Sequence, residues 1–184
     1  IKTVKKIISY IMVCVLFLSM CIPCEAAQTS TATASDANAT TGFPQITSTS
    51  AIIMDAQSGQ IIYEKNSHTR QYPASITKIM TAYLAIKNGD LNSTITMSDA
   101  AVWGIDRNSS HIALDVGEEI SMSDALYAVM LMSANEAAWA IAEQVSGSLE
   151  NFVQLMNDTA QSLGCKDTHF TNANGLDDPD QFPS

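Results

Sequence analysis

The segment from Ser75 to Ile86 limits the fold more than any other part of this chain, because nearly every position in it is apolar. Its few polar positions are Ser75, Thr77, Lys78 and Thr81. A helix that is apolar on every side is normally enclosed by other elements of a core. The pattern therefore predicts a helix from Ser75 to Lys87 that is buried nearly all round, with Asn88 and Gly89 in the C-terminal capping position.

Ser75 and Lys78 lie three residues apart on that helix and are therefore neighbours on one face. The same face continues through Ala82, Ala85 and Ile86. The Lys78 amine is thus directed toward the interior, where unpaired lysines are rare, and it lies in the first turn, where the helix dipole disfavours a cation. Both effects favour the neutral amine, the form that can take a proton from a serine hydroxyl. The alternative is a Lys78 side chain that reaches solvent beside an N-capping Ser75.

A second polar island, Ser133-Ala134-Asn135, interrupts a helical run that begins near Ser121. The spacing from Ser121 to Asp124 suits an N-cap at that start. Side chains two residues apart do not share a helix face, but they do where the backbone is extended. A break that aims Ser133 and Asn135 into one cleft suits a hydroxyl that relays a proton and an amide that holds a substrate. A simple helix-terminating turn is the alternative, because Ser and Asn often end helices.

Two β-rich runs precede the first helix. They are Ala51–Asp55 and Gln60–Glu64, and the Gly-containing turn between them predicts a hairpin. Two strands alone are only marginally stable in water. We therefore expect the hairpin to dock on more sheet or on helices.

Helical periodicity resumes beyond the second polar island. It runs to Gly147, and again from Leu149 to Leu163 with Gly164 as the stop. Residues 168–184 are expected to form a loop. Three methionines are expected to pack in the core and not to form a recognition surface: Met122, Met130 and Met132.

The N-terminus has the layout of a secretory signal peptide. Basic residues precede an apolar stretch from about Ile7 to Ile22, and Ala26-Ala27 supplies small residues for cleavage. We therefore predict a signal peptide over residues 1–26, a flexible linker rich in Thr, Ala and Ser over residues 27–45, and secretion to the extracytoplasmic side. The alternative, a retained transmembrane anchor, needs roughly 20 apolar residues, and polar residues thin out the shorter run here.

Charge and residue spacing exclude several functions. The formal net charge is −10 at pH 7, and removal of residues 1–26 takes away three lysines and one glutamate, so nucleic acid is not an expected partner. His68, His111 and His169 lie far apart without the spacing of a metal site, and no Gly-rich phosphate loop is present. We therefore expect no metal and no cofactor. Of the four cysteines only Cys165 follows the predicted signal peptide, so no disulfide framework is expected.

Residues Tyr72–Thr81, YPASITKIMT, closely resemble the active-site segment of the D-alanyl-D-alanine carboxypeptidases, the low-molecular-weight penicillin-binding proteins. Other stretches also resemble that family: Ala51–Glu64, Ser109–Glu118, Ser133–Ala138 and Thr168–Asp177. The resemblance covers residues 46–184, which we expect to be the N-terminal part of the catalytic domain. It implies an α+β fold of the β-lactamase and penicillin-binding-protein transpeptidase type, an antiparallel sheet beside a helical subdomain, incomplete at its C-terminus.

The resemblance also implies a role for each site residue. Ser75 attacks the carbonyl of a terminal D-Ala-D-Ala and becomes acylated, and Lys78 accepts its proton. Ser133 passes a proton toward the leaving D-alanine, while Asn135 holds the substrate amide and helps orient Lys78. The backbone N–H of Ser75 forms half of the oxyanion hole. The implied partners are peptidoglycan pentapeptides as substrate and β-lactams as inhibitors that acylate Ser75, in the bacterial cell envelope.

The sequence departs from the family in lacking Lys-Thr-Gly, on the strand that binds the substrate carboxylate. We therefore expect a C-terminally truncated chain, inactive and poorly stable by itself, of an active full-length carboxypeptidase. Membrane association is expected only through a segment beyond residue 184. A serine β-lactamase is an alternative, although the Glu that class A enzymes use has no counterpart between Asp167 and Asn174. An inactive wall-binding or regulatory remnant is another.

Overall fold

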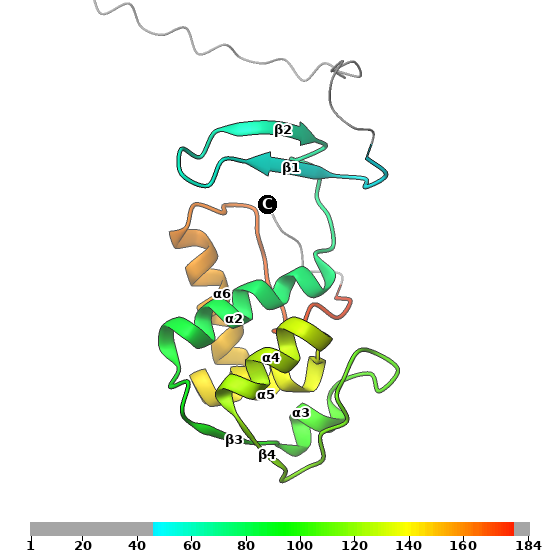
Figure 1. The fold of residues 1–184 in the computed structure, drawn as a ribbon, viewed down its shortest axis with the longest axis vertical. Coiled ribbons are helices and arrows are strands. Elements are labelled where there is room, and N and C mark those ends of the chain that lie inside the picture. The colour runs from blue at the N-terminus through cyan, green and yellow to red at the C-terminus, as the bar shows by residue number, and fades with distance from the viewer. Residues whose placement is uncertain (1–45, 179–184) are drawn as a thin grey trace, which may run out of the picture. The chain divides into compact units, whose positions relative to one another are not determined.

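The computed structural model describes residues 46–178. The predicted signal peptide (1–26) and linker (27–45) lie outside the described residues, as does the end of the predicted loop, 179–184. The chain divides at Thr47 into two units, and the helices and strands of Figure 1 belong to the second. None of the helices described is long and apolar enough to cross a membrane.

The first two strands form the hairpin that the sequence predicts. β1 (Ala51–Met54) and β2 (Ile61–Lys65) pair antiparallel. In the turn between them, the Asp55 carboxylate accepts hydrogen bonds from the backbone N–H and the hydroxyl of Ser58, and Gly59 takes φ +72°. The hairpin is a two-stranded sheet of its own, so the expected docking on more sheet is not seen among the described strands. Its apolar side chains are about half exposed: Ile52, Ile53, Met54, Ile61 and Ile62.

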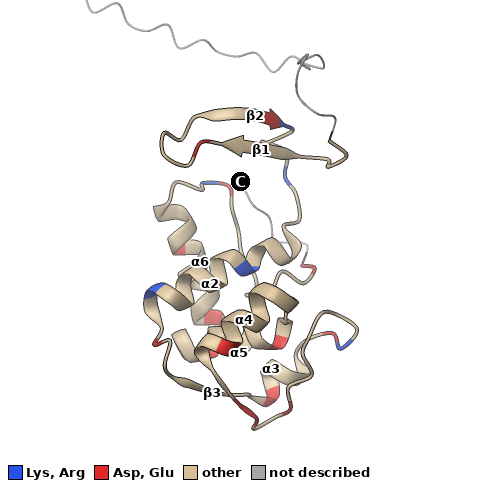
Figure 2. Cartoon of the chain, viewed as in Figure 1, with Lys and Arg blue, Asp and Glu red and all other residues tan. Residues whose placement is uncertain are grey.

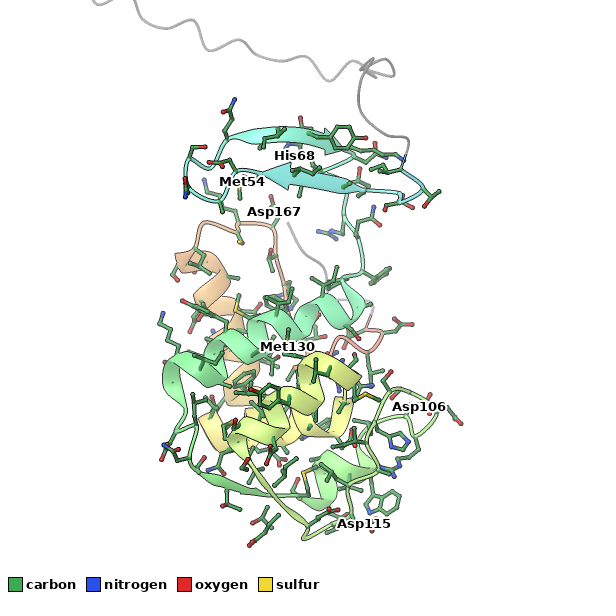
Figure 3. All side chains as sticks on the ribbon, viewed as in Figure 1. Met54, His68, Asp106, Asp115, Met130 and Asp167 are labelled. Atoms are coloured by element: carbon green, nitrogen blue, oxygen red, sulfur yellow. The ribbon has the colours of Figure 1, made fainter. Side chains whose placement is uncertain are left out.

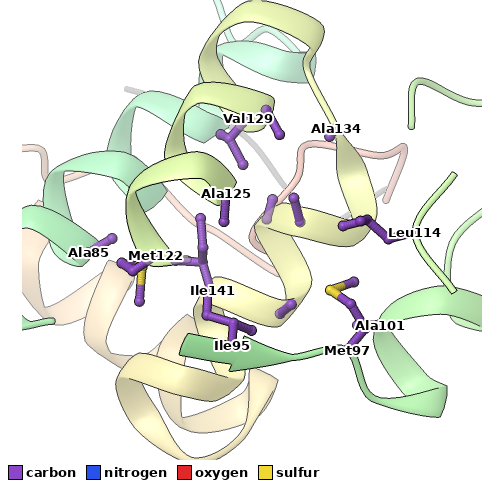
Figure 4. Packing of buried hydrophobic residues seen from close by; sticks show 14 of the residues in the cluster. Ala85, Ile95, Met97, Ala101, Leu114, Met122, Ala125, Val129, Ala134 and Ile141 are labelled. Carbon is purple, nitrogen blue, oxygen red and sulfur yellow. The ribbon is translucent and has the colours of Figure 1, made fainter. Parts of the chain in front are cut away.

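Helix α5 (Asn135–Ser146) contacts the other long helices, which are α2 (Thr77–Asn88), α4 (Met122–Met132) and α6 (Leu149–Ser162). Its buried residues are mostly alanines, so its neighbours approach closely, and Ile141 extends into the apolar cluster (Figure 4). Other members of that cluster are Ile95, Met97, Leu114, Met122 and Val129. The core therefore holds α2, which carries Lys78, and α4, which leads to Ser133, against the helix that begins at Asn135.

The predicted helix ends are confirmed where a capping residue marks them. At the start of α4, Ser121 Oγ accepts a hydrogen bond from the Asp124 N–H at 3.0 Å, as their spacing predicts. Gly147 ends α5 with φ +78°, a conformation that glycine adopts without steric cost. Helix α6 buries Phe152 and Met156 on the predicted apolar face.

Three short elements were not predicted. β3 (Thr94–Thr96) and β4 (Glu119–Ser121) pair antiparallel, and α3 (Asp99–Trp103) lies between them in the chain. Ser98 Oγ caps α3 by accepting a hydrogen bond from the Ala101 N–H at 3.0 Å. Elements this short do not complete enough periods for alternation or helical spacing to stand out in the sequence.

The prediction that the first helix is buried all round is wrong. After a 3₁₀ turn, η1 (Ala74–Ile76), α2 buries one face, which includes Lys78, Thr81 and Leu84. The opposite apolar positions are exposed by 40 to 69%: Ile76, Ile79, Tyr83 and Ile86. The prediction that the inward face of Lys78 continues through Ile86 is therefore wrong, although it holds for Ala82 and Ala85. These positions recur every three or four residues and so form one stripe along the helix. The spacing of apolar residues along a helix shows that a face is apolar, but it does not show whether another element covers that face.

The methionines of α4 give a second correction. Met122 is fully buried, as predicted, but Met130 and Met132 are 53% and 61% exposed (Figure 3 labels Met130). The prediction of core packing is therefore wrong for the last two. Both lie in the final turn of α4, which leads directly to Ser133.

Candidate active site

The turn that carries Ser75 has a strained backbone. Ala74 takes φ +47°, in the left-handed region that residues with a Cβ rarely adopt. Gly175 lies so close behind this turn that a Cβ on it would overlap the Ala74 carbonyl oxygen. Ser75 is exposed, and no side-chain hydrogen bond caps the start of η1 or α2. The alternative of Ser75 as an N-cap is therefore wrong, and its hydroxyl is open to an incoming ligand.

Lys78 is the buried member of the site. Its side chain is only 2% exposed, which contradicts the alternative that it reaches solvent. The amine donates hydrogen bonds to Ser75 Oγ at 3.1 Å, to Asn135 Oδ1 at 2.7 Å and to the Asn174 carbonyl at 2.6 Å. A neutral amine has two N–H donors and one lone pair. If the two N–H groups of a neutral Lys78 donate to Asn135 and Asn174, its lone pair faces Ser75 Oγ.

The environment of Lys78 lowers the pKa of its ammonium from 10.5 to about 8. Desolvation by burial is the main cause, and the Glu136 carboxylate opposes it by raising the pKa. Roughly one molecule in ten then carries the neutral amine at pH 7. The predicted direction is therefore confirmed, but the ammonium remains the major form at neutral pH. Acidic side chains outnumber basic ones along the described chain (Figure 2), and Glu136 is the carboxylate that acts on Lys78.

Ser133 forms the break between α4 and α5. It takes the left-handed conformation, with φ +56° and ψ +34°, and Ala134 after it is extended. Its Oγ donates a hydrogen bond to Ser75 Oγ at 2.8 Å. The two interpretations of this segment are therefore compatible, because the same turn ends α4 and brings a second hydroxyl to Ser75.

Asn135 is 3% exposed, and its side-chain oxygen, side-chain nitrogen and backbone N–H are each hydrogen-bonded. Its side-chain oxygen faces Lys78, its Nδ2 donates to Ser109 Oγ at 2.8 Å, and its backbone N–H donates to the Ser110 carbonyl at 2.9 Å. The lysine amine is a donor there, which assigns the oxygen of the amide to that side. The Asn135 oxygen can still accept a second hydrogen bond and Nδ2 can still donate one, as contact with a substrate amide requires.

The segment around Asn174 contributes contacts that the residue-by-residue prediction missed. Besides the Asn174 carbonyl on Lys78, the Ala173 carbonyl accepts a hydrogen bond from Thr81 Oγ1 at 2.6 Å. Asn172 Oδ1 accepts from the N–H groups of Asn174 and Gly175, which fixes the turn. The resemblance pointed to this segment but assigned it no role. Its polar, Gly-containing sequence signals a turn, not a particular carbonyl.

His68, His111 and His169 do not form a metal site, because no group of three potential metal-binding side chains occurs among the described residues. His111 instead joins two parts of one loop. One ring nitrogen contacts the Arg107 carbonyl at 3.1 Å and the other accepts from the Ala113 N–H at 3.0 Å. Cys165 is half-buried and is not in a disulfide.

Comparison with known proteins adds independent information. Residues 35–184 match the family model Peptidase_S11, D-alanyl-D-alanine carboxypeptidase. The D-alanyl-D-alanine carboxypeptidase DacA of Haemophilus influenzae is 43% identical over 149 residues, which cover 77% of this chain and 37% of that protein. DacA of Escherichia coli is 38% identical over 151 residues, which cover 78% and 38%. The chain thus spans little more than a third of the length of these relatives.

Solved structures agree with the sequence comparison. Penicillin-binding protein 5 of Haemophilus influenzae superposes with a TM-score of 0.71 at 40% identity, covering 77% of this chain and 42% of that one. The DD-transpeptidase of Streptomyces K15 gives a TM-score of 0.71 at 29% identity, covering 77% and 57%. The neighbours have the predicted penicillin-binding-protein fold, of which the described helices and small antiparallel sheets are a part. The chain belongs to the Peptidase_S11 family of D-alanyl-D-alanine carboxypeptidases.

Proposed function

We propose that the protein carrying this chain is a serine D-Ala-D-Ala carboxypeptidase that removes the terminal D-alanine from peptidoglycan stem peptides. The observation that supports this most directly is the position of one exposed hydroxyl. Ser75 Oγ lies 3.1 Å from the buried amine of Lys78 and 2.8 Å from Ser133 Oγ. Nucleophile, base and proton relay are thus within hydrogen-bonding distance before any substrate binds.

In the proposed acylation step, Ser75 Oγ forms a bond to the carbonyl carbon of the penultimate D-alanine as its proton moves to Lys78. The C–N bond to the terminal D-alanine then breaks. Ser133 delivers a proton to the departing nitrogen and is replenished from Lys78, so that the charge of the site is unchanged once the ester has formed. Asn135 holds the substrate amide through the hydrogen-bonding capacity that its contacts with Lys78 and Ser109 leave.

Water completes the reaction by attacking the ester carbonyl. As the C–O bond to Ser75 breaks, one proton of the water passes to Ser75 Oγ, and the other is released to solvent because the shortened peptide leaves as a carboxylate. β-Lactams would enter the first step as substrate mimics, because opening of the ring also transfers an acyl group to Ser75. No residue in this scheme needs a metal or a cofactor.

The surroundings of the reaction are part of the same proposal. We place residues 46–184 in the N-terminal part of the catalytic domain, after a signal peptide over 1–26 and a linker over 27–45. Such a leader would deliver the enzyme to the outside of the cytoplasmic membrane, where stem peptides are exposed. The backbone N–H of Ser75 would supply half of the oxyanion hole.

Labelling with a fluorescent penicillin tests the proposal on the full-length protein. We expect covalent labelling at Ser75, located by mass spectrometry, and release of D-alanine from a peptide ending in D-Ala-D-Ala without an acceptor amine. Ser75→Ala should abolish both, and Ser58→Ala, a serine in the hairpin turn, is the matched control that should preserve both. Wild-type protein that is not labelled would refute the proposed chemistry. Rapid turnover of a chromogenic cephalosporin would instead indicate a β-lactamase.

A further inference from the structure

Glu136 is a buried carboxylate to which neither the sequence analysis nor the proposed mechanism gives a role. It is the second residue of α5, directly after Asn135, and its side chain is 0% exposed. Oε1 accepts a hydrogen bond from the Ile112 N–H at 2.7 Å. Oε2 is buried and has no hydrogen-bond partner within the described chain. A buried carboxylate with one oxygen unpaired is costly unless other charges or dipoles compensate it.

Two features of the site compensate this charge. Glu136 lies in the first turn of α5, where the helix dipole favours an anion. The other is Lys78, whose amine has only uncharged hydrogen-bond partners within the described chain: the Ser75 hydroxyl, the Asn135 amide and the Asn174 carbonyl. Glu136 is also the charged side chain that acts on Lys78 through space. Glu136 directly follows Asn135, whose side-chain oxygen accepts from the Lys78 amine, so its carboxylate is the candidate counter-charge for an ammonium at Lys78.

Glu136 also fixes the loop that orients Asn135. Two consecutive residues of α5 bind this loop, because the Asn135 N–H donates to the Ser110 carbonyl and Glu136 accepts from the Ile112 N–H. In the same loop, directly before Ser110, Ser109 Oγ accepts a hydrogen bond from Asn135 Nδ2. Loss of the Ile112 contact would release one of these two hydrogen bonds between α5 and the loop that carries Ser109. The Glu136 carboxylate thus acts on Lys78 by two routes. One is electrostatic. The other is structural: Glu136 binds the loop at Ile112, the same loop carries Ser109, and Ser109 binds Asn135, which accepts from Lys78.

We propose that Glu136 is a positioning residue for acyl transfer: its carboxylate fixes the loop that orients Asn135 and supplies the counter-charge for the ammonium that Lys78 becomes on taking the Ser75 proton. The proposal rests on the proposed function for its final step. Its structural part, the effect of Glu136 on Lys78 and on the loop, stands independently of turnover.

Direct titration of Lys78 tests the proposal. Lysine side chains labelled with ¹³C at Cε would be followed by NMR against pH in the full-length protein, with Lys78 assigned by its loss in Lys78→Met. Glu136→Gln keeps an oxygen that can accept from Ile112 but removes the charge. We expect it to move the Lys78 midpoint below that of the wild type and to leave the Ile112 N–H protected from hydrogen exchange. Glu136→Ala should lower the midpoint and also expose the Ile112 N–H.

The matched control is Glu143→Gln, on the same helix, where the carboxylate accepts from Ser98 Oγ and Trp139 Nε1 away from Lys78. It should leave the Lys78 midpoint unchanged. An unchanged midpoint in Glu136→Gln would overturn the counter-charge role, and full protection of Ile112 in Glu136→Ala would overturn the loop role. If Glu136→Ala does not fold, Glu136→Gln still decides the counter-charge role, and an Ile112 N–H that exchanges freely in the wild type would overturn the loop role.

Penicillin labelling separates this proposal from the proposed function. In Glu136→Gln, the acidic limb of the labelling rate should move to lower pH together with the Lys78 midpoint. A purely structural role would lower the rate at every pH without moving the limb. If wild-type Ser75 is not labelled at all, the proposed function fails, while the Lys78 titration still supports or contradicts the effect of Glu136.

Discussion

Replacement of Gly175 by alanine should disturb the active site, because Gly175 packs against the backbone of Ala74, the residue before Ser75. Gly175 takes φ +80°, and a Cβ at this position would lie well inside contact distance of the Ala74 carbonyl oxygen and 3.0 Å from Thr77 Oγ1. The overlapping atom belongs to the backbone, so no side chain can rotate away. Either the turn before Ser75 or the segment of Asn174 must move. Since the Asn174 carbonyl accepts from Lys78 at 2.6 Å, either shift disturbs the site.

The structure separates two contributions to the cost. The left-handed conformation alone costs a residue with a Cβ about 1 to 2 kcal/mol, and overpacking adds typically about 1 to 3 kcal/mol. Gly164→Ala isolates the first contribution, because Gly164 takes φ +90° and no atom lies within 4 Å of the point that its Cβ would occupy. We therefore expect Gly164→Ala to cost about 1 to 2 kcal/mol of unfolding free energy and Gly175→Ala about 2 to 5 kcal/mol.

Urea unfolding of the full-length protein, followed by circular dichroism, measures both changes. Penicillin labelling adds a functional measurement, in which Gly175→Ala should slow acylation of Ser75 and Gly164→Ala should not. Equal losses of stability in the two variants would refute the argument, because they would show that no backbone overlap limits position 175. A destabilised Gly175→Ala that labels at the wild-type rate would show that the Asn174 carbonyl does not position Lys78.

Four further predictions concern the groups around Ser75. Acylation should accelerate as pH rises through about 8, the pKa of Lys78, because only the neutral amine takes the serine proton; a flat profile of penicillin labelling would contradict this. The unfolding free energy should also rise between pH 8 and 10.5, where the unfolded chain holds the Lys78 proton and the folded chain does not; subtraction of the Lys78→Met curve isolates this rise in urea titrations. Ser133→Gly should be about 1 kcal/mol more stable than Ser133→Ala, because glycine adopts φ +56° without strain, and equal unfolding midpoints of the two variants would count against this. Both variants should be labelled by penicillin about 10² to 10⁴ times more slowly than the wild type, because both lack the hydroxyl. Ser109→Ala should slow labelling about five-fold, the equivalent of about 1 kcal/mol for the lost hydrogen bond to Asn135 Nδ2, and an unchanged rate would mean that this contact does not orient the amide.

Contacts between residues that lie close together in the chain could be predicted from the sequence. Ser75 and Lys78 meet because positions three apart share a helix face, and Ser121 caps α4 because its hydroxyl reaches an N–H three residues ahead. The hairpin follows from two β-rich runs around a turn. In each case the geometry of one turn or one helical face determines the contact, so the order of residue types is sufficient.

Contacts across the chain were predictable only in part. Lys78 and Asn174 are 96 positions apart, and the acceptor is a backbone carbonyl, which every residue possesses. No residue type therefore marks Asn174 as a neighbour of Lys78. The exposed stripe of α2, including Ile79 and Ile86, is the converse case, since an apolar pattern predicts that a face can be buried without identifying the element that buries it.

Backbone strain gives a separate argument about which groups carry the chemistry. Among the described residues, the non-glycine positions with φ between +45° and +63° are Asn66, Ala74, Ala113 and Ser133, and all but the first belong to segments that build the site. Ala74 precedes the nucleophile, Ala113 follows the Ile112 N–H that binds Glu136, and Ser133 presents its own hydroxyl. Such positions cost about 1 to 3 kcal/mol each and persist only where the surrounding structure holds them. Glycine at position 133 would form the same turn with less strain but would bring no hydroxyl to Ser75, so the serine found there supports a chemical role for that hydroxyl.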